Sequence, residues 1–257
     1  MDSRVKQPGF VFKECVPSKR GCVPAVVHSP TRSAAFGHGS PGVVICCHGL
    51  LSAKDSPKFV QMGERLAEEG LWVLRFDFTG CGENTCSFKR SLLETRLDDL
   101  QSVVDWVCGP NRPWGDRPVV GLFGSSLGGF LSYVFSGRFP ERIKATAVWA
   151  APARLHDIGA GSNRRPLELE PAWPSKLPLG TPNSIDALPS VSNVLVLHGT
   201  KDELVPWHHA TVLYRAASEE KRLILLEDAD HRLTDAQVRA KATELTASWL
   251  FSKLMER

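Results

Sequence analysis

Six short runs of apolar residues recur along the chain, and they constrain its fold more than any other feature. The runs are residues 43–48, 71–76, 119–123, 143–150, 194–198 and 222–226. A strand that is apolar along its whole length is buried on both faces. Strands that alternate with helices form mostly parallel sheets that the helices cover. We therefore predict an α/β fold, with a mostly parallel sheet and helices on both of its faces.

The segments around these runs carry signals for helices and for one hairpin. Helices are predicted at about 55–69, 92–107, 126–136, 208–217 and 233–254. In the first of them, Asp55 can cap the N-terminus with Pro57 in the first turn, and Gly70 can end the helix. Near the start of the chain, two strand candidates at 10–16 and 22–28 flank a Ser-Lys-Arg-Gly turn and can form a hairpin.

Length and charge describe one ordinary globular unit. The 257 residues exceed the usual domain length, but α/β folds of this size often form a single unit, so we expect one domain over 1–257. The formal net charge is only +3 and no dense basic tract occurs, which speaks against a nucleic-acid partner. No stretch approaches the roughly 18 apolar residues of a membrane span.

The seven cysteines are scattered along the chain, and they are odd in number. This usage is typical of free thiols in a reducing compartment rather than of a disulfide scaffold. No apolar segment follows the first six residues, so we see no secretory signal and expect a cytoplasmic protein. Cys46 and Cys47 fall within an apolar run and are expected in the core. Without a Cys-x-x-Cys pair, we expect no metal site.

A glycine-rich stretch, Gly-Leu-Phe-Gly-Ser-Ser-Leu-Gly-Gly at 121–129, joins the third apolar run to a predicted helix. It lacks the lysine of a phosphate-binding P-loop and the glycine spacing of a dinucleotide site. It does contain Gly-x-Ser-x-Gly, which fits a sharp strand-to-helix turn that exposes a nucleophile and needs small residues on both sides. Ser126 has Gly124 and Gly128 at those positions, whereas Ser125 has bulky residues there. The spacing therefore selects Ser126 as the candidate nucleophile.

A serine nucleophile needs a histidine to take its proton and a carboxylate to orient that histidine. In this architecture the acid and then the histidine follow the serine along the chain. His231 lies in the loop after the last apolar run and is the candidate base. Asp202 follows the preceding run and is the candidate acid, with Asp157 as its rival. Other downstream histidines are expected to be structural or solvated: His198, His208 and His209.

Four segments resemble the α/β-hydrolase superfamily, especially its small serine esterases and its serine aminopeptidase-like and dienelactone-hydrolase-like members. They are His-Gly-Leu-Leu at 48–51, Gly-x-Ser-x-Gly at 124–128, His-Gly-Thr-Lys-Asp-Glu-Leu-Val-Pro at 198–206, and the loop with His231. The resemblance implies an oxyanion hole formed by the backbone N–H groups of Leu50 and Leu127. His48 is expected to brace its loop rather than to act in catalysis.

Two further segments compare with this superfamily. Asp-Phe-Thr-Gly-Cys-Gly at 77–82 resembles its Asp-x-x-Gly-x-Gly turn, although Glu83 stands where many relatives have serine. Residues 151–190 are rich in proline and form either a long surface excursion or a lid over the site. The resemblance implies a short cap here, which leaves the pocket partly open. Trp149 and Trp173 either line this cap or belong to the core or the surface.

These observations predict a serine hydrolase that cleaves carboxylic esters of small to medium acyl or alcohol groups. Ser126 would attack the carbonyl, His231 would act as general base and Asp202 would orient it, without cofactor or metal. The partner is a small-molecule ester; the natural substrate and the oligomeric state are left open. The same triad could instead cleave a thioester, or an amide with Glu83 or Glu203 as anchor for a peptide terminus. A non-catalytic ligand-binding protein is the remaining alternative.

Overall fold

The computed structural model describes residues 9–32, 40–85, 93–155, 184–186 and 190–256. The strands in this part of the chain are β1 (Val11–Ser18), β2 (Gly21–His28), β3 (Gly42–Cys47), β4 (Trp72–Phe76), β5 (Val119–Ser125), β6 (Ala145–Trp149), β7 (Val194–Gly199) and β8 (Lys221–Leu226). The helices are α1 (Pro57–Glu69), α2 (Leu93–Val107), α3 (Leu127–Arg138), α4 (His208–Ala216) and α5 (Ala236–Met255).

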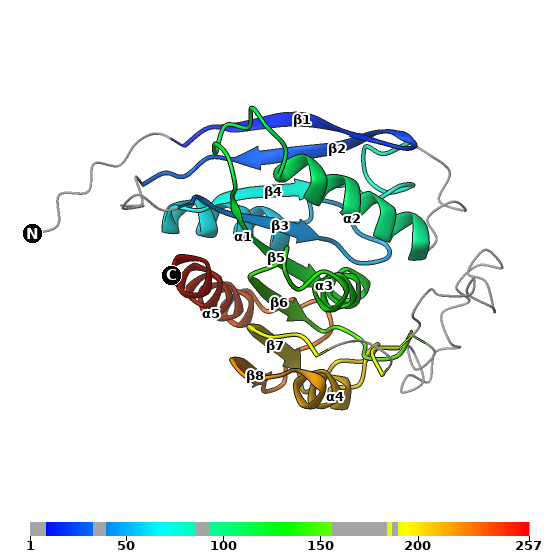
Figure 1. Cartoon of the computed structure of the whole chain (residues 1–257). Coiled ribbons are helices and arrows are strands. Elements are labelled where there is room, and N and C mark those ends of the chain that lie inside the picture. Colours follow the sequence, from blue (N-terminus) through cyan, green and yellow to red (C-terminus); the bar gives the residue numbers. More distant parts are fainter. Residues whose placement is uncertain (1–8, 33–39, 86–92, 156–183, 187–189, 257) are drawn as a thin grey trace, which may run out of the picture.

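The eight strands form one sheet in the order β1-β2-β4-β3-β5-β6-β7-β8 (Figure 1). The strands from β4 to β8 in this order pair in parallel, whereas the β1–β2 hairpin joins the edge of β4 antiparallel. Every residue of β3, β6 and β7 is buried, as their continuous apolar runs require. The predicted α/β fold with a mostly parallel sheet is confirmed, and so is the N-terminal hairpin.

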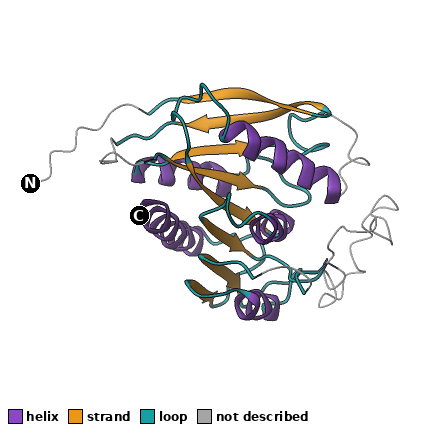
Figure 2. Ribbon diagram, in the orientation of Figure 1, coloured by secondary structure: helices purple, strands orange, loops and turns teal. Residues whose placement is uncertain are grey.

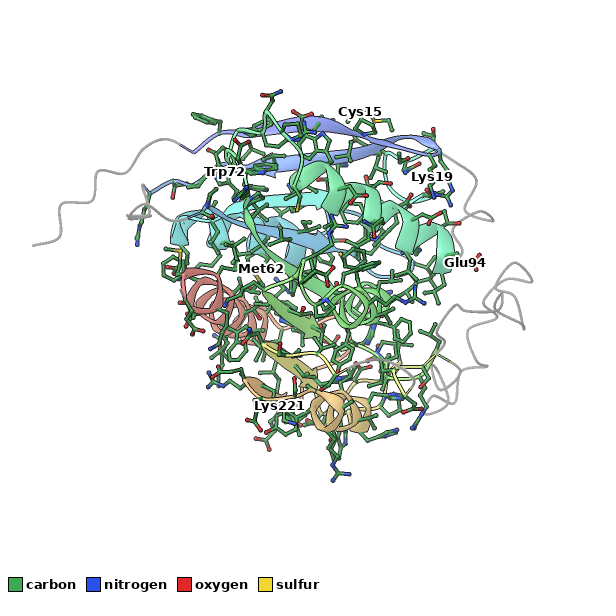
Figure 3. All side chains as sticks on the ribbon, in the orientation of Figure 1. Cys15, Lys19, Met62, Trp72, Glu94 and Lys221 are labelled. Carbon is green, nitrogen blue, oxygen red and sulfur yellow. A yellow bond between two sulfur atoms is a disulfide. The ribbon has the colours of Figure 1, made fainter. Side chains whose placement is uncertain are left out.

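Helices cover both faces of the sheet, with α1 and α5 on one face and α2, α3 and α4 on the other (Figure 2). Met62 of α1 is fully buried against the sheet (Figure 3). Trp149 belongs to the same layer, where its ring packs edge-on against Phe123 and its indole N–H donates to Thr246 Oγ1 at 2.8 Å. Trp149 is therefore a core residue and does not line a cap.

The ends of α1 agree with the sequence at all but one position. Pro57 is the first helical residue and Gly70 ends the helix in the left-handed conformation, with a φ of 101°. The N-cap, however, is Ser56 and not Asp55, and Ser56 makes no side-chain capping bond. The carboxylate of Asp55 instead accepts hydrogen bonds from Lys54 and Arg75, which draw it away from the helix end.

The expectation of free thiols throughout is wrong for one pair of cysteines. A disulfide joins Cys15 to Cys22 across the β1–β2 hairpin, with 5.3 Å between their Cα atoms. The hairpin register pairs Cys15 with Pro24, so that Cys22 is a diagonal neighbour on the adjacent strand. Cys46 and Cys47 lie buried in β3 as predicted, and burial raises the pKa of the Cys47 thiol to about 12.

Most of the predicted cap at 151–190 lies outside the described residues, and with it His156, Asp157 and Trp173. Two short parts of it are described, residues 151–155 after β6 and residues 184–186. Arg154 and Ser184 form an isolated antiparallel β-bridge between these parts. In the described part of the chain, no helix has the length and apolarity needed to span a membrane.

Candidate active site

The turn between β5 and α3 has the shape that the glycine spacing predicts. Ser126 stands at its apex with a φ of 56° and a ψ of −126°, a conformation that exposes its side chain above the sheet. A Cβ at position 124 would lie 2.3 Å from the Gly128 carbonyl oxygen, and one at position 128 would lie 2.1 Å from the Cys47 oxygen. Both distances are too short for any side chain. Glycine is thus required at 124 and 128, and Ser126 is the residue between them.

Three loops at the carboxyl edge of the sheet bring Ser126, His231 and Asp202 together. Nε2 of His231 lies 3.0 Å from Oγ of Ser126, and Nδ1 lies 2.8 Å from Oδ2 of Asp202. Because a carboxylate only accepts, Nδ1 carries the proton and donates it, which leaves Nε2 able to accept the proton of Ser126. The three candidate residues therefore form one connected line of hydrogen bonds, in the chain order expected from the sequence.

The carboxylate of Asp202 is fully buried but surrounded by donors. The backbone N–H groups of Leu204 and Val205 donate to Oδ1 at 2.9 and 2.8 Å. Burial alone would raise the pKa of Asp202, but the hydrogen bonds from His198 and His231 outweigh it and hold that pKa well below its ordinary value. The acid is thus ionised throughout the neutral range and presents a fixed negative charge to His231.

His198 contacts the acid directly, which the sequence reasoning missed. Its Nε2 lies 2.9 Å from the Val205 carbonyl oxygen and 3.0 Å from Oδ2 of Asp202. Because both of these atoms only accept, Nε2 carries the proton and shares it between them. The signal was present in the sequence, since His198 and Asp202 flank the same strand end, four residues apart. His198 is structural, as predicted, and the group that it holds in place is the carboxylate of Asp202.

The second serine of the turn points elsewhere. Ser125 is only 2% exposed, and its Oγ accepts a hydrogen bond from Nζ of Lys58 at 3.0 Å. Burial, together with the positive charge of Arg232, lowers the pKa of Lys58 to about 8. The hydroxyl of Ser125 is therefore buried and engaged, whereas Ser126 remains partly exposed. The sequence carries no evident signal for the contact with Lys58, which comes from α1.

The loop after β3 passes beside Ser126, the candidate nucleophile. A Cβ on Gly49 would lie 3.3 Å from Cβ of Ser126, so the backbone of this loop approaches the serine closely. Leu50 follows in this loop, and Leu127 is the first residue of α3, where backbone N–H groups have no acceptor within the helix. Both residues are therefore neighbours of Ser126, one along the chain and one through the approach of Gly49.

His48 braces this loop from inside the protein. Its Nδ1 donates to the Gly49 carbonyl oxygen at 2.7 Å, and its Nε2 accepts from the backbone N–H of Phe78 at 3.1 Å. Burial and the charge of Arg96 lower the pKa of His48 to about 3, so the ring is neutral. This geometry agrees with the bracing role expected for His48.

The turn at 77–82 is held by the buried carboxylate of Asp77. It accepts from the backbone N–H of Lys54 at 2.8 Å, from Lys54 Nζ at 2.9 Å and from the backbone N–H of Glu83 at 2.9 Å. A Cβ on Gly82 would lie 2.3 Å from this carboxylate, which explains the glycine. The Glu83 carboxylate contacts Lys54 at 2.8 Å and Lys13 at 2.7 Å, so Glu83 strengthens the network at the position where serine is common.

Both glutamates considered as an anchor for a peptide terminus already make contacts within the protein. Glu83 is engaged by the two lysines, and Glu203 accepts the backbone N–H of His231 at 3.2 Å. In the described residues, no group of three or more histidine, cysteine or acidic side chains is arranged to hold a metal ion. The side chains that meet at this edge of the sheet include a serine, a histidine and a carboxylate.

Comparison with known proteins agrees with this fold. The model of the α/β-hydrolase fold family matches residues 42–162. The structure superposes on Est1E from Butyrivibrio proteoclasticus, solved with bound ferulic acid, with a TM-score of 0.73 and 18% identity over 95% of this chain and 100% of that one. The chain has the α/β-hydrolase fold. Dienelactone hydrolase from Anabaena variabilis also superposes, with a TM-score of 0.69 and 18% identity over 95% of this chain and 98% of that one.

A curated relative is also similar in sequence. The rat (Rattus norvegicus) protein named palmitoyl-protein thioesterase ABHD10, mitochondrial, is 26% identical over 219 residues. The match covers 76% of this chain and 70% of the rat protein.

Proposed function

We propose that this chain is a serine hydrolase that cleaves carboxylic esters of small to medium acyl or alcohol groups. The observation that carries the proposal is the line of hydrogen bonds from Asp202 through His231 to Ser126, with lengths of 2.8 and 3.0 Å. Such lengths lie within the reach that a general base needs. The match of residues 42–162 to the α/β-hydrolase fold family supports the same conclusion.

In the proposed mechanism, Ser126 Oγ attacks the ester carbonyl carbon while Nε2 of His231 takes its proton. The backbone N–H groups of Leu50 and Leu127 stabilise the oxyanion, each worth on the order of 3 kcal/mol of the barrier. The protonated His231 passes its proton to the leaving alcohol, and the acyl group stays on Ser126. A water molecule activated by His231 then releases the acid and restores the serine. Asp202 stabilises the imidazolium in both steps.

Thioesters are the second candidate substrate class, because the rat relative is named a palmitoyl-protein thioesterase. The same three residues can attack a thioester carbonyl, and no additional group is required. Amide substrates are disfavoured because Glu83 and Glu203 already have partners. A non-catalytic role is disfavoured because the hydrogen bonds of a general-base triad are all made.

A fluorophosphonate probe tests the proposed nucleophile. We expect it to label the wild-type protein at one serine, and we expect Ser126→Ala to abolish the labelling. Ser125→Ala is the matched control, since it removes the neighbouring hydroxyl, which is buried and bound to Lys58. This control should keep most of the labelling and turnover. An unlabelled wild-type protein, or equal labelling of Ser126→Ala, would contradict the proposal.

A substrate panel tests the class of bond. The panel contains nitrophenyl esters from acetate to palmitate and thioesters with the same acyl groups. Within it, we expect the short to medium esters to have the highest kcat/KM. A clear preference for palmitoyl thioesters would move the assignment to the second candidate class. The short cap over 151–190 and the cytoplasmic location remain predictions from the sequence, and the name of the rat relative gives that protein as mitochondrial.

A further inference from the structure

A fully buried arginine lies beside the loop that approaches the nucleophile. Arg96 belongs to α2, and its guanidinium group reaches across the interior to the loop after β3. Nη1 donates to the carbonyl oxygen of Gly49 at 3.4 Å, and Nη2 donates to the carbonyl oxygen of Leu50 at 3.1 Å. Its planar end also lies over the ring of Phe78, 4.9 Å from the ring centre. The arginine therefore holds two successive peptide groups, on both sides of the Leu50 Cα atom.

The first of these peptide groups is the one that carries the Leu50 N–H. A trans peptide is planar, so its C=O and N–H point in opposite directions. The carbonyl of Gly49 is held by two donors at once, Nδ1 of His48 at 2.7 Å and the guanidinium of Arg96. Because the carbonyl is drawn towards these buried groups, the Leu50 N–H must point the other way. Gly49 also passes close to Ser126, since a Cβ on Gly49 would lie 3.3 Å from Cβ of Ser126.

The second peptide group is fixed in a similar way. The Leu50 carbonyl accepts from Nη2 of Arg96 and lies 3.7 Å from the sulfur of Cys81. The same guanidinium nitrogen contacts this sulfur at 3.1 Å. Rotation of either peptide about the Leu50 Cα would therefore break contacts to a buried charged group, and a buried group that loses its partners is costly. The direction of the Leu50 N–H is set before any substrate arrives.

We propose that Arg96 is a positioning residue for the oxyanion hole, which it organises by holding the Gly49–Leu50 peptide so that the Leu50 N–H faces the reacting carbonyl oxygen. The inference rests on the proposed hydrolase function. Arg96 touches neither the substrate nor Ser126 in this scheme and acts only through the backbone of Leu50. Donors fixed in advance stabilise developing charge without reorganising during the reaction.

The test uses Arg96→Met, which keeps a long side chain but removes the donors and the charge. The matched control is Arg112→Met, because Arg112 also lies over an aromatic ring, that of Trp106, and also donates to a backbone carbonyl. We expect Arg96→Met to lower kcat on a nitrophenyl ester by about 10- to 100-fold, the range for a misplaced catalytic group, with KM within about twofold. The control should leave both constants unchanged.

A trifluoromethyl ketone inhibitor separates positioning from stability. Its adduct with the nucleophilic serine carries an oxyanion, so its inhibition constant should weaken in Arg96→Met by the same factor as kcat/KM. A purely structural role would lower the melting temperature and leave kcat and the inhibition constant of the folded protein at their wild-type values. That result would overturn the inference while the proposed function stands.

Arg96→Lys keeps the inference testable if Arg96→Met does not fold. Lysine retains the charge but cannot bridge two carbonyl groups with a planar fork, so we expect a smaller loss in kcat, of about 10-fold, with KM again unchanged. A folded Arg96→Lys protein with wild-type kcat and inhibitor affinity would overturn the inference. A wild-type protein that neither reacts with the fluorophosphonate nor hydrolyses esters would overturn the proposed function and this inference with it.

Discussion

Lowering the pH should destabilise this protein through two histidines that are buried in the neutral form. Nε2 of His48 accepts the backbone N–H of Phe78 at 3.1 Å, and Nε2 of His28 accepts Nε–H of Arg75 at 2.9 Å. If either Nε2 gained a proton, it would become a donor facing another donor, and the hydrogen bond would be lost. Burial and Arg96 lower the pKa of His48 to about 3, and burial and Arg75 lower the pKa of His28 to about 4.

The sign and size of the effect follow from these two pKa values. The ordinary histidine pKa is 6.5, so between pH 6.5 and about 4 the unfolded chain binds protons that the folded chain does not. The free energy of unfolding therefore falls as the pH falls through this window. At about pH 5, each histidine has lost roughly 2 kcal/mol of its contribution, or about 4 kcal/mol for both. Domains of this kind have about 5–15 kcal/mol in total, so the loss should be easy to measure.

Urea unfolding at about pH 7.5 and pH 5 measures it directly. His48→Asn keeps an N–H group near the Gly49 carbonyl oxygen and removes the titrating nitrogen, so it should lose about half as much free energy of unfolding as wild type between the two pH values. His208→Asn is the control, because His208 is exposed on α4, and it should keep the full wild-type loss. A His48→Asn variant whose loss equals that of wild type would refute the reasoning, and so would a wild-type protein with no loss.

Three further changes test the site. Asp202→Asn should lower kcat on a nitrophenyl ester by about 10⁴-fold with the fold intact by circular dichroism, because an amide no longer selects the proton position on His231; a loss below 10-fold would assign the acid elsewhere. His198→Leu removes a donor to Asp202 and should raise the pKa of that carboxyl, which an NMR titration of the Asp202 carboxylate measures; an unchanged carboxyl pKa would contradict the contact. Gly128→Ala places a Cβ 2.1 Å from the Cys47 carbonyl oxygen and should lower the free energy of unfolding by about 3 kcal/mol or more in urea titrations; wild-type stability would show that the turn can relax.

Most helices and strands could be predicted because their signals are local. The six apolar runs correspond to β3 to β8, and no strand end lies more than two residues from its predicted position. The differences come from neighbouring strands. For example, β5 extends beyond its predicted end at Phe123 to Ser125, because Ser125 pairs with Trp149 of β6. A single strand's sequence does not contain that information.

The predictions that were wrong concern contacts between side chains. Asp55 has the residue type of a helix cap, but Lys54 and Arg75 compete for its carboxylate. Cys15 and Cys22 are too few and too far from the other cysteines to suggest a disulfide scaffold, but the hairpin register makes them neighbours. In each case the partner of the side chain depends on how the chain packs, which the local sequence does not show.

Two results could be predicted from the sequence alone, the α/β fold and the position of the candidate nucleophile, Ser126. The reason is that both depend on short-range sterics: continuous apolar runs need burial on two faces, and the turn at Ser126 admits only glycine at 124 and 128. The tertiary structure alone decided which groups support the site. Arg96 lies 47 residues from Gly49, and His231 lies 105 residues from Ser126, so these contacts exist only once the sheet has brought the loops of separate strands to one edge.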